Sequence, residues 1–289
     1  MKLPLLYKDR RQEADTPVRA AQLVELHLAE VFRAICDRHG LKYWLACGTL
    51  LGALRHQGPI PWDDDFDVMI LEPDYRKFLE FAASELPDDV YLETPDKNLR
   101  MENHITRLRD AYSWGLVRRD KRLLVNDHNG ICIDIFPVRE CGRRCRLTKW
   151  LLRRLSSAYG WYKRAHFNDV TVTNVLVKWC LGLKVLTLKL GFETTQLFCR
   201  KDHYVMASWF LNDRMWWPKE WIVRPGKESR MARFDNADFP VPFESEAVLE
   251  MQYGNWRNLP PCEERKGYLS VCLPTTPCFH SKAMQWEVG

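Results

Sequence analysis

The stretch Trp62–Ile70, which reads WDDDFDVMI, decides the fold. Side chains alternate between the two faces of a β-strand, so Phe66, Val68 and Ile70 share one apolar face that we expect to meet the core. The opposite face carries three carboxylates, those of Asp63, Asp65 and Asp67. Carboxylates repeated about 7 Å apart repel one another unless a cation lies beside them, and a divalent metal ion is the usual cation. The stretch therefore predicts a buried strand with a metal site on its polar face.

A simpler interpretation of the same stretch is a solvated acidic loop after Pro61, in which an aspartate caps a helix. We favour the metal site because the aspartates lead directly into an apolar, β-branched strand. The expected ion is Mg²⁺, with Mn²⁺ as the alternative, because Mg²⁺ binds a few carboxylates and leaves positions for substrate phosphates.

A glycine-threonine pair upstream points to the same chemistry. Gly48 and Thr49 lie between a predicted strand over residues 41–47 and a predicted helix. Glycine permits close backbone approach, and the free N–H groups of a helix N-terminus bind phosphate. Arg55 and His56 follow before the acidic stretch, where they either reach the same phosphates or lie in solvent.

A later carboxylate, Asp134, lies in the apolar segment Gly130–Pro137, which reads GICIDIFP. A lone aspartate inside such a strand is costly to bury without a partner. It caps a turn, pairs with an arginine, or supplies a third carboxylate to the metal site, and the residues alone leave these three roles open. Arg107 and Arg109 lie on another strand candidate, and we expect them to pair with nearby acids.

Strand-like segments alternate with helical patterns in the first 140 residues, which predicts an α/β or α+β layer with helices against a sheet. The clearest helix begins after Thr16 and ends at Gly40, because threonine is a good N-cap and glycine a good helix stop. Residues 146–212 are mostly helix-like, residues 225–245 are rich in turns, and the segment after Pro261 has no clear period.

These motifs together resemble the nucleotidyltransferase superfamily and, more specifically, the LicD family of bacterial phosphocholine transferases and eukaryotic fukutin-related proteins. The resemblance rests on four segments: Tyr43–His56 (YWLACGTLLGALRH), Ile60–Asp67 (IPWDDDFD), Gly130–Val138 (GICIDIFPV) and Tyr253–Pro261 (YGNWRNLPP). It extends over residues 20–262, most of the chain. One departure is Cys47, which stands where the family often has a glycine.

The resemblance implies an α+β nucleotidyltransferase fold, a mixed sheet with flanking helices and a helical C-terminal elaboration. We expect a catalytic core over residues 16–140, a helical elaboration over 141–262 and a C-terminal tail over 263–289.

The activity that the resemblance implies is transfer of a phospho-alcohol, either phosphocholine or a polyol phosphate. The donor is CDP-activated, the acceptor is a hydroxyl of a cell-surface or lipid-linked glycan, and CMP is released. Asp65 and Asp67 match the metal-binding pair, Asp63 matches the preceding acidic position, and Asp134 matches the later carboxylate, a metal ligand or a base. We expect Gly48, Thr49, Arg55 and His56 to contact the donor phosphates.

A basic segment runs from Arg139 to His166, with nine Lys and Arg against a single acid, Glu140. Its charge of +8 exceeds the +5 of the whole chain, and Trp and Leu residues are interleaved with the cations. Such a helix suits an anionic membrane surface, although a solvated helix over an ordinary core has the same composition. RNA also fits a basic aromatic stripe, but no nucleic-acid motif accompanies it, so we do not expect a nucleic-acid partner.

The sequence also bears on the compartment. The apolar patch in the first 15 residues is too short for a secretory signal, and no apolar stretch approaches the roughly 18 residues of a membrane span. The ten cysteines are scattered and form no CxxC pair, so we expect buried thiols and only a weak case for zinc. We therefore expect a cytoplasmic protein that associates peripherally with the inner face of the membrane.

Other functions remain open at this stage. A nucleotidyltransferase that adds NMP to a small molecule or protein would use the same carboxylates and release pyrophosphate. A metal-dependent glycosyltransferase also uses an Asp-x-Asp motif, but the Gly-Thr turn gives it no support. A basic scaffold that binds membrane or RNA, with a purely structural acidic strand, is the non-enzymatic alternative.

Overall fold

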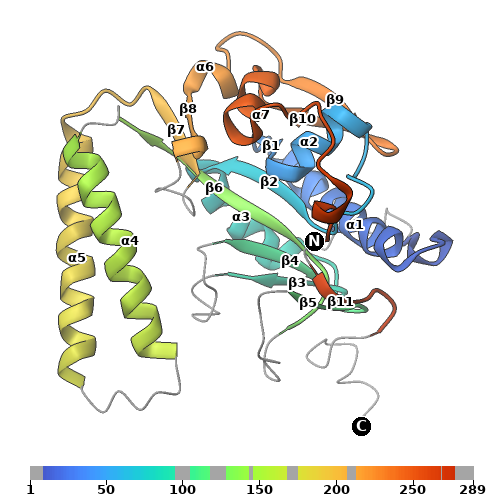
Figure 1. Cartoon of the computed structure of the whole chain (residues 1–289), viewed down its shortest axis with the longest axis horizontal. Helices are drawn as coiled ribbons and strands as arrows, with labels where there is room; N and C mark the ends of the chain where they lie inside the picture. Colours follow the sequence, from blue (N-terminus) through green and yellow to red (C-terminus); the bar gives the residue numbers. More distant parts are fainter. Residues whose placement is uncertain are drawn as a thin grey trace.

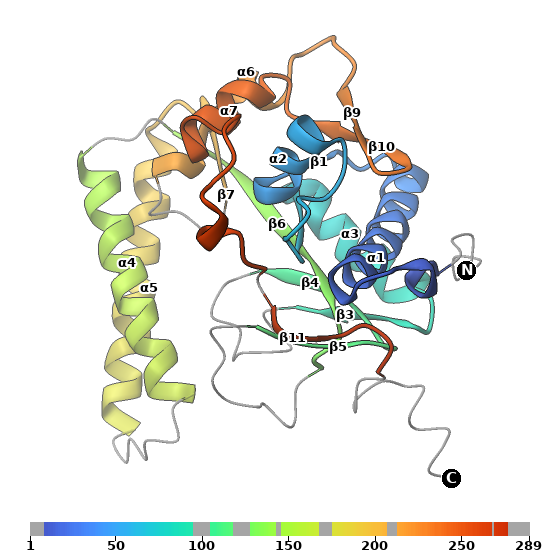
Figure 2. The same cartoon turned by 45° about the vertical axis from the view of Figure 1, so that its right-hand side comes forward.

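The structure is a computed structural model, and it describes residues 9–94, 105–117, 128–142, 146–167, 175–206, 213–267 and 269–276. Over these ranges the chain is a mixed α/β fold in which helices flank a curled mixed sheet, as predicted (Figure 1). Two long helices stand to one side of this body in both views (Figure 2).

The main sheet is built around its longest strand, β6 (Cys132–Cys141). On one side β6 pairs in parallel with β2 (Phe66–Leu71), and β2 pairs antiparallel with β1 (Tyr43–Leu45). On the other side β6 pairs antiparallel with β4 (Thr106–Asp110), which carries β3 (Val90–Glu93) at its far edge. The strand β2 is therefore central, which explains its nearly continuous apolar sequence.

The remaining strands extend the body. The second half of β6 pairs with β7 (His203–Met206), which carries β8 (Trp216–Pro218). Four strands form two separate antiparallel pairs: β9 (Arg230–Phe234) with β10 (Ala237–Val241), and β5 (Trp114–Val117) with β11 (Leu269–Leu273).

The first helix, α1 (Pro17–His39), follows the predicted signals. The Thr16 hydroxyl accepts a hydrogen bond from the Arg19 N–H at 3.2 Å, and Gly40 ends the helix in the left-handed region with φ of 63°. The apolar face of α1 packs on the main sheet, and Phe66, Val68 and Ile70 of β2 are buried in the same core. The prediction of a core-facing apolar side on this strand is confirmed.

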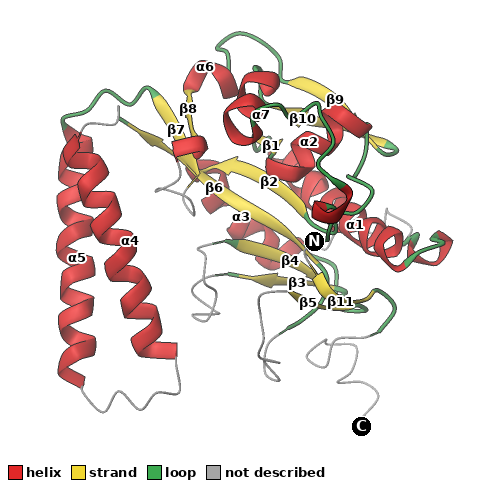
Figure 3. Ribbon diagram, in the orientation of Figure 1, coloured by secondary structure: helices red, strands yellow, loops and turns green. Residues whose placement is uncertain are grey.

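The other helices cover the sheet or stand beside it (Figure 3). The helices α2 and α3 lie next to β2 in the sequence and contact it, while α7 packs on α2. The bounds of the helices after α1 are α2 (Cys47–His56), α3 (Glu72–Glu85), α4 (Arg146–Phe167), α5 (Val175–Leu197), α6 (Lys219–Ile222) and α7 (Ser245–Tyr253). None of the helices in the described ranges combines the length and apolar character that crossing a bilayer requires.

Three sequence-based expectations about secondary structure are wrong in part. The helix-like range 146–212 contains the strand β7, which joins the main sheet. The turn-rich range 225–245 contains the hairpin of β9 and β10, and the segment after Pro261 contains β11. These strands are four or five residues long and depend on partners elsewhere in the chain, so local patterns do not reveal them.

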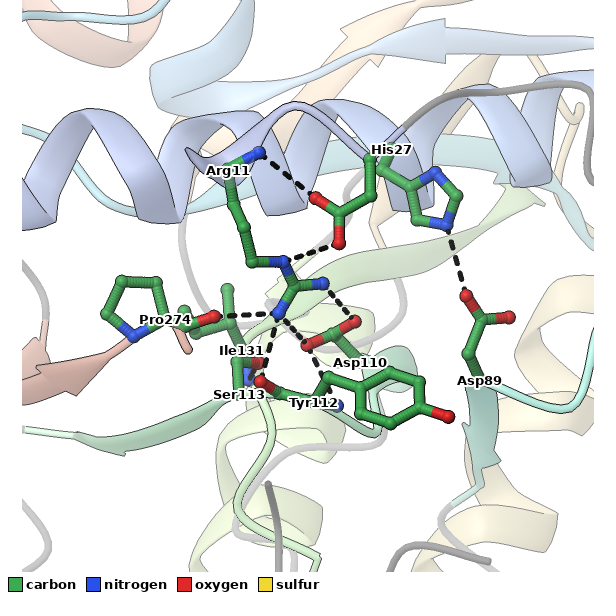
Figure 4. Close-up of polar contacts among 9 residues, drawn as sticks. Arg11, His27, Asp89, Asp110, Tyr112, Ser113, Ile131 and Pro274 are labelled. Carbon is green, nitrogen blue, oxygen red and sulfur yellow. Dashed lines mark hydrogen bonds and ion pairs between the residues drawn. The ribbon is translucent and has the colours of Figure 1, made fainter. Parts of the chain in front are cut away.

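The two ends of the described chain meet at a buried arginine (Figure 4). The guanidinium of Arg11 contacts both carboxylate oxygens of Asp110 at 2.9 and 2.7 Å, and the Asp110 side chain is fully buried. The same guanidinium donates to the carbonyl oxygens of Tyr112 and Pro274. Arg11 therefore ties the N-terminal segment, the end of β4 and the residues after β11 into one polar cluster.

Candidate active site

A row of charged side chains crosses the main sheet. Asp67 of β2 is in register with Asp134 of β6, and Asp134 is in register with Arg107 of β4. Glu93 of β3 continues the row beside Arg107. Neighbouring strands lie about 4.8 Å apart, so the carboxylates of Asp67 and Asp134 are close neighbours on one face. The structure thus brings together two of the three aspartates that the sequence indicated as catalytic.

The arginines of β4 pair with acids, as expected. Arg107 Nε donates to Asp134 Oδ1 at 2.7 Å, and Arg109 Nε donates to Glu93 Oε2 at 2.5 Å. Burial alone would lower the pKa of Arg107, but the carboxylate of Asp134 outweighs this effect and raises it. One oxygen of Asp134 is therefore engaged by an arginine, which is one of the three roles that the sequence left open.

The start of α2 lies against the carboxylates. The backbone N–H of Gly48 donates to the Asp67 carboxylate. A Cβ atom added to Gly48 would lie 3.0 Å from Asp63 Oδ2 and 3.6 Å from Asp65 Oδ1, so a larger residue would crowd the Asp63 side chain and touch that of Asp65. The close backbone approach expected of this glycine is therefore present, and it is an approach to the aspartates.

Thr49 joins α2 to the acidic strand. Its buried hydroxyl accepts a hydrogen bond from the Asp67 N–H at 2.7 Å, and the Ala46 N–H donates to the Asp67 carbonyl oxygen at 3.0 Å. These bonds hold the first turn of α2 beside the first residues of β2. Cys47, between them, has φ of 46°, a left-handed conformation that favours glycine.

The acidic loop before β2 is held by α1 and by the C-terminal segment. The side-chain amide of Gln22 donates to the carbonyl oxygens of Ile60 at 3.1 Å and Asp63 at 2.8 Å. Gly267 packs so closely on Asp64 that an added Cβ would lie 2.6 Å from Asp64 Oδ2. The loop is therefore fixed from two sides, one of them contributed by the range that the sequence indicated as a tail.

The electrostatics of this site oppose ionisation of its aspartates. Burial raises the pKa of Asp63 to about 6, with repulsion from Asp64 as the next cause. Burial also raises the pKa of Asp65 and of Asp67 well above the ordinary value, and each carboxylate is further repelled by its neighbours. Among the described residues, the buried Oδ1 atom of Asp65 has no hydrogen-bond partner.

Two residues near this cluster were missed by the sequence analysis. Glu25 of α1 is buried, and its pKa is raised well above the ordinary value by burial and by repulsion from the aspartates, Asp64 first. Tyr253 at the end of α7 is 44% exposed as a whole residue, but burial of its hydroxyl group, together with the nearby Cys47 and Asp67, raises its pKa. A carboxylate on the apolar stripe of a helix was the available signal for Glu25, whereas Tyr253 had only its place in the YGNWRNLPP segment.

The two cationic residues after α2 are partly committed elsewhere. Arg55 Nη1 donates to the carbonyl oxygens of Trp256 at 2.9 Å and Asn258 at 3.3 Å. His56 lies against Arg55 and edge-on to Trp62, and its pKa is lowered by burial and by the charge of Arg55. These contacts attach the end of α2 to the segment that follows α7.

The residues fit a divalent cation in part. Within the described ranges, no group of three or more His, Cys, Asp or Glu side chains is arranged to hold a metal ion. Mg²⁺, however, is commonly held by one or two carboxylates, with waters and substrate phosphates at its other positions. Asp65, with a buried unpaired oxygen, and the adjacent Asp67 suit that role, because a cation there would relieve their mutual repulsion.

Trp209, Trp216, Trp217 and Trp221 lie close together in the sequence, which predicts either packing in the core or a cage for a choline group, because aromatic faces attract quaternary ammonium ions. Trp216 and Trp217 of β8 are buried, and Trp221 packs partly buried against the main core, which confirms packing for these three. Trp209 lies outside the described residues.

The weak case for zinc rested on Cys141 with Cys145 and on Cys272 with Cys278 and the nearby His280. Cys145, Cys278 and His280 lie outside the described residues.

Comparison with known proteins points to one family. Residues 40–168 match the model of the LicD/FKTN/FKRP nucleotidyltransferase domain. Over this range the chain is similar to the LicD family. Over 260 residues, which are 86% of this chain and 94% of the relative, it is 26% identical to the lipopolysaccharide cholinephosphotransferase LicD of Haemophilus influenzae.

Shorter similarities connect the LicD-like chain to two uncharacterised proteins. One, from Rickettsia typhi, is 40% identical over 71 residues, which are 22% of this chain and 23% of the relative. The other, from Rickettsia prowazekii, is 57% identical over 40 residues, which are 14% of this chain and 15% of the relative. The range that matches the LicD model contains every predicted site residue from Gly48 to Asp134, while Glu25 and Tyr253 lie outside it.

Proposed function

We propose that this chain transfers a phospho-alcohol from a CDP-activated donor to a hydroxyl of lipopolysaccharide or another cell-surface glycan and releases CMP. The transferred group is phosphocholine or a polyol phosphate. The observation that carries this proposal is the pair of crowded carboxylates, Asp65 and Asp67, which lie beside the start of α2 within the range that matches the LicD model. The similarity to a lipopolysaccharide cholinephosphotransferase over most of the chain supports phosphocholine as the first donor group to test.

The proposed chemistry is an in-line displacement at phosphorus. The acceptor oxygen forms a bond to the phosphorus that carries the alcohol, the bond to CMP breaks, and the acceptor hydroxyl loses its proton. Asp65 and Asp67 would hold Mg²⁺ or Mn²⁺, with Asp63 beside them, and the ion would neutralise the charge that develops on the departing CMP. A bound cation would also offset the mutual repulsion of these buried carboxylates.

Asp134 has two roles in this proposal that experiment must separate. It is a further metal ligand through the oxygen that Arg107 does not hold, or it accepts the proton of the acceptor hydroxyl. Arg107 positions Asp134 in either role, because the guanidinium fixes the carboxylate beside Asp67.

The donor phosphates are proposed to lie at the start of α2. Gly48 lets the first turn of α2 approach the aspartates closely, and Thr49 keeps that turn attached to the acidic strand. Arg55 and His56 were expected to contact the donor, and we propose that Arg55 acts mainly by holding the segment around Trp256 over the site.

The direct test is product analysis with a panel of donors. CDP-choline, CDP-ribitol and CDP-glycerol are each incubated with the chain, Mg²⁺ and lipopolysaccharide, and the products are identified by mass spectrometry. We expect CMP together with an acceptor heavier by the transferred phospho-alcohol, and loss of both products with EDTA and recovery on adding Mg²⁺.

A matched pair of variants completes the test. Asp67→Asn is expected to abolish turnover, whereas Asp238→Asn, which makes the same change on an exposed residue of β10, is expected to leave it unchanged. Release of pyrophosphate from an NTP without CMP would instead indicate NMP transfer. Absence of any Mg²⁺-dependent nucleotide binding would contradict the enzymatic proposal and favour a scaffold.

A further inference from the structure

The helices α4 and α5 form a pair that is attached to the body at one end. They contact each other extensively, and both views show them standing away from the sheet (Figures 1 and 2). Near the attachment, a small separate core contains Leu151, Phe192 and Trp216. The Gln196 side chain accepts a hydrogen bond from the Gly142 N–H at 2.8 Å at the same end.

One face of α5 packs on α4. Leu181, Val185 and Leu188 are half-buried and Phe192 is buried, and this spacing of three to four residues places them on one side of the helix. Gly191 lies close to Leu151 of α4, where an added Cβ would be 3.5 Å from the leucine side chain. This face has the partner that an apolar helix face requires.

The opposite face of α5 is equally apolar and lies in solvent. Six residues recur there at intervals of three, four or seven, and between 52% and 81% of each is exposed: Leu176, Trp179, Leu183, Leu186, Leu190 and Leu197. At 1.5 Å per residue, this stripe is about 32 Å long. A helix that is apolar on all sides is normally buried, so the α5 stripe requires a partner that the described ranges of the chain do not provide.

The charge around the α5 stripe is almost entirely positive. The two helices contain nine Lys and Arg and one acid, Glu193. Glu193 is neutralised at the attached end by Arg139, which contacts it at 2.6 Å. Among the cations, Arg153, Arg154, Lys184 and Lys189 are exposed, so the free part of the pair offers cations beside leucine and tryptophan.

We propose that the α4–α5 pair is a membrane-docking element that lays the α5 stripe on a bilayer containing anionic phospholipid. Leucine and tryptophan enter the boundary between headgroups and acyl chains, while lysine and arginine contact the headgroup phosphates. Charge complementarity identifies the occupant, because a second copy of this chain would bring the same excess of cations to the interface. The transfer chemistry does not use this surface, so membrane docking can be tested independently of the proposed function.

The test measures vesicle binding of the full chain rather than turnover. The protein is sedimented with vesicles of phosphatidylcholine alone and of phosphatidylcholine mixed with phosphatidylglycerol, at low and high salt. We expect binding to the anionic vesicles, little binding to the neutral ones, and weaker binding at high salt. Wild type that binds neither kind of vesicle would overturn the proposal without any variant being needed.

Matched variants then locate the surface. Leu183→Glu, on the α5 stripe, is expected to lower the partition constant by about tenfold or more, because it replaces a leucine that would enter the bilayer with a charged side chain. Met231→Glu is the control, since Met231 is similarly exposed on β9 of the body. Lys184→Glu combined with Lys189→Glu is expected to reduce binding to anionic vesicles specifically. Unchanged thermal midpoints would show that the variants fold.

Three other outcomes would overturn the proposal. Equal vesicle binding by Leu183→Glu and wild type would mean that the stripe does not touch the bilayer. A dimer in wild type that becomes a monomer in Leu183→Glu, with no change in vesicle binding, would assign the stripe to a second copy. Binding of polyuridine with no vesicle binding would assign the cations to nucleic acid.

Discussion

Two parts of this molecule break the usual rule of burial in opposite directions. The acidic site buries carboxylates against one another, whereas the α4–α5 pair leaves a row of leucine and tryptophan in solvent. Both arrangements cost free energy in the isolated chain. We propose that a cation and a phosphorylated donor account for the acidic site, and that a bilayer accounts for the exposed stripe. The two regions that depart from the usual burial of apolar and charged side chains are therefore the two regions where we propose that the chain binds a ligand or a membrane.

The largest expected effect concerns the acidic site. Asp65→Asn should lower turnover by about a thousandfold or more, because several kcal/mol of electrostatic stabilisation depend on the ligand pair. The same change should raise the free energy of unfolding by about 1 kcal/mol, because it removes repulsion between buried carboxylates. Steady-state kinetics and chemical denaturation of one preparation check both effects.

Full turnover in Asp65→Asn would remove the metal assignment. Reduced stability with normal turnover would show that Asp65 is structural. The acidic site would then no longer be a region that sacrifices stability for ligand binding. Asp238→Asn serves again as the control for both measurements, since its side chain is exposed.

Removing a buried charge that has an oppositely charged partner should lower the free energy of unfolding, in contrast to Asp65→Asn. Arg11→Met should lower the free energy of unfolding by about 3–5 kcal/mol, because it leaves the buried carboxylate of Asp110 without its partner. Arg76→Met is the control, because Arg76 forms an exposed ion pair with Glu72 on α3. Urea denaturation of both variants checks this, and equal losses would show that burial does not distinguish the two pairs.

The pair of His27 and Asp89 gives the body a pH dependence (Figure 4). Burial would lower the pKa of His27, but Asp89, with its Oδ2 3.6 Å from Nε2, outweighs burial and raises it above 6.5. The stabilisation is therefore complete below pH 6.5 and is lost as the pH rises through the higher pKa of the folded state.

Substitution of the histidine should expose this dependence. The loss of unfolding free energy in His27→Gln should be larger at pH 6 than at pH 9, measured by urea denaturation at both values. The pKa of Asp89 is lowered, so its share is present above pH 3.8 and does not vary in this range. An equal loss at both pH values would show that His27 stays neutral in the folded protein.

A smaller effect is expected at the turn that supports the acidic site. Cys47→Gly should be about 1 kcal/mol more stable than Cys47→Ala, because φ of 46° is strained for alanine and not for glycine. The order should reverse at Ala83, an exposed position of α3, where Ala83→Gly should cost about 1 kcal/mol. Thermal unfolding of wild type and the three variants checks the order of stability at both positions.

The smallest effect is expected on the α5 stripe. Leu190→Ala should change the free energy of unfolding by less than about 0.5 kcal/mol, because the side chain is exposed. Phe192→Ala, two residues along the same helix, should cost about 3–5 kcal/mol, because Phe192 is buried in the small core at the attachment. A large loss in Leu190→Ala would mean that the stripe is covered by the chain itself.

The sequence predicted those elements whose signals are local. Thr16 and Gly40 bound α1 as expected, and the alternation in Phe66–Ile70 predicted a core strand. The strands β7 and β11 were missed because a strand of four or five residues is stabilised by partners distant in sequence. The long apolar pattern of α5 predicted a helix, but no local pattern tells which of its faces is covered.

The candidate site was predictable in composition and less so in geometry. The acidic stretch and Asp134 were identified from residue type, yet the register that aligns Asp134 with Asp67 depends on the parallel pairing of β2 with β6. The sequence left three roles open for Asp134, and its contact with Arg107 was one of them. The choice depends on which residues surround Asp134 in three dimensions. Glu25 was missed because its neighbours come from another part of the chain. The ligand roles of these residues stay predictions.

The contact between Arg11 and Pro274 has a consequence for folding during synthesis on the ribosome. The two residues are 263 positions apart, and the ribosome delivers residues in order at about 5–20 per second, so they meet only after roughly 13–53 seconds. The carboxylate of Asp110 can meet Arg11 much earlier, because Arg11 precedes it in the chain, but β5 lacks its partner until β11 has been made. An unpaired strand edge in a growing polypeptide invites association with other chains, and the pairing of β11 with β5 removes that exposure.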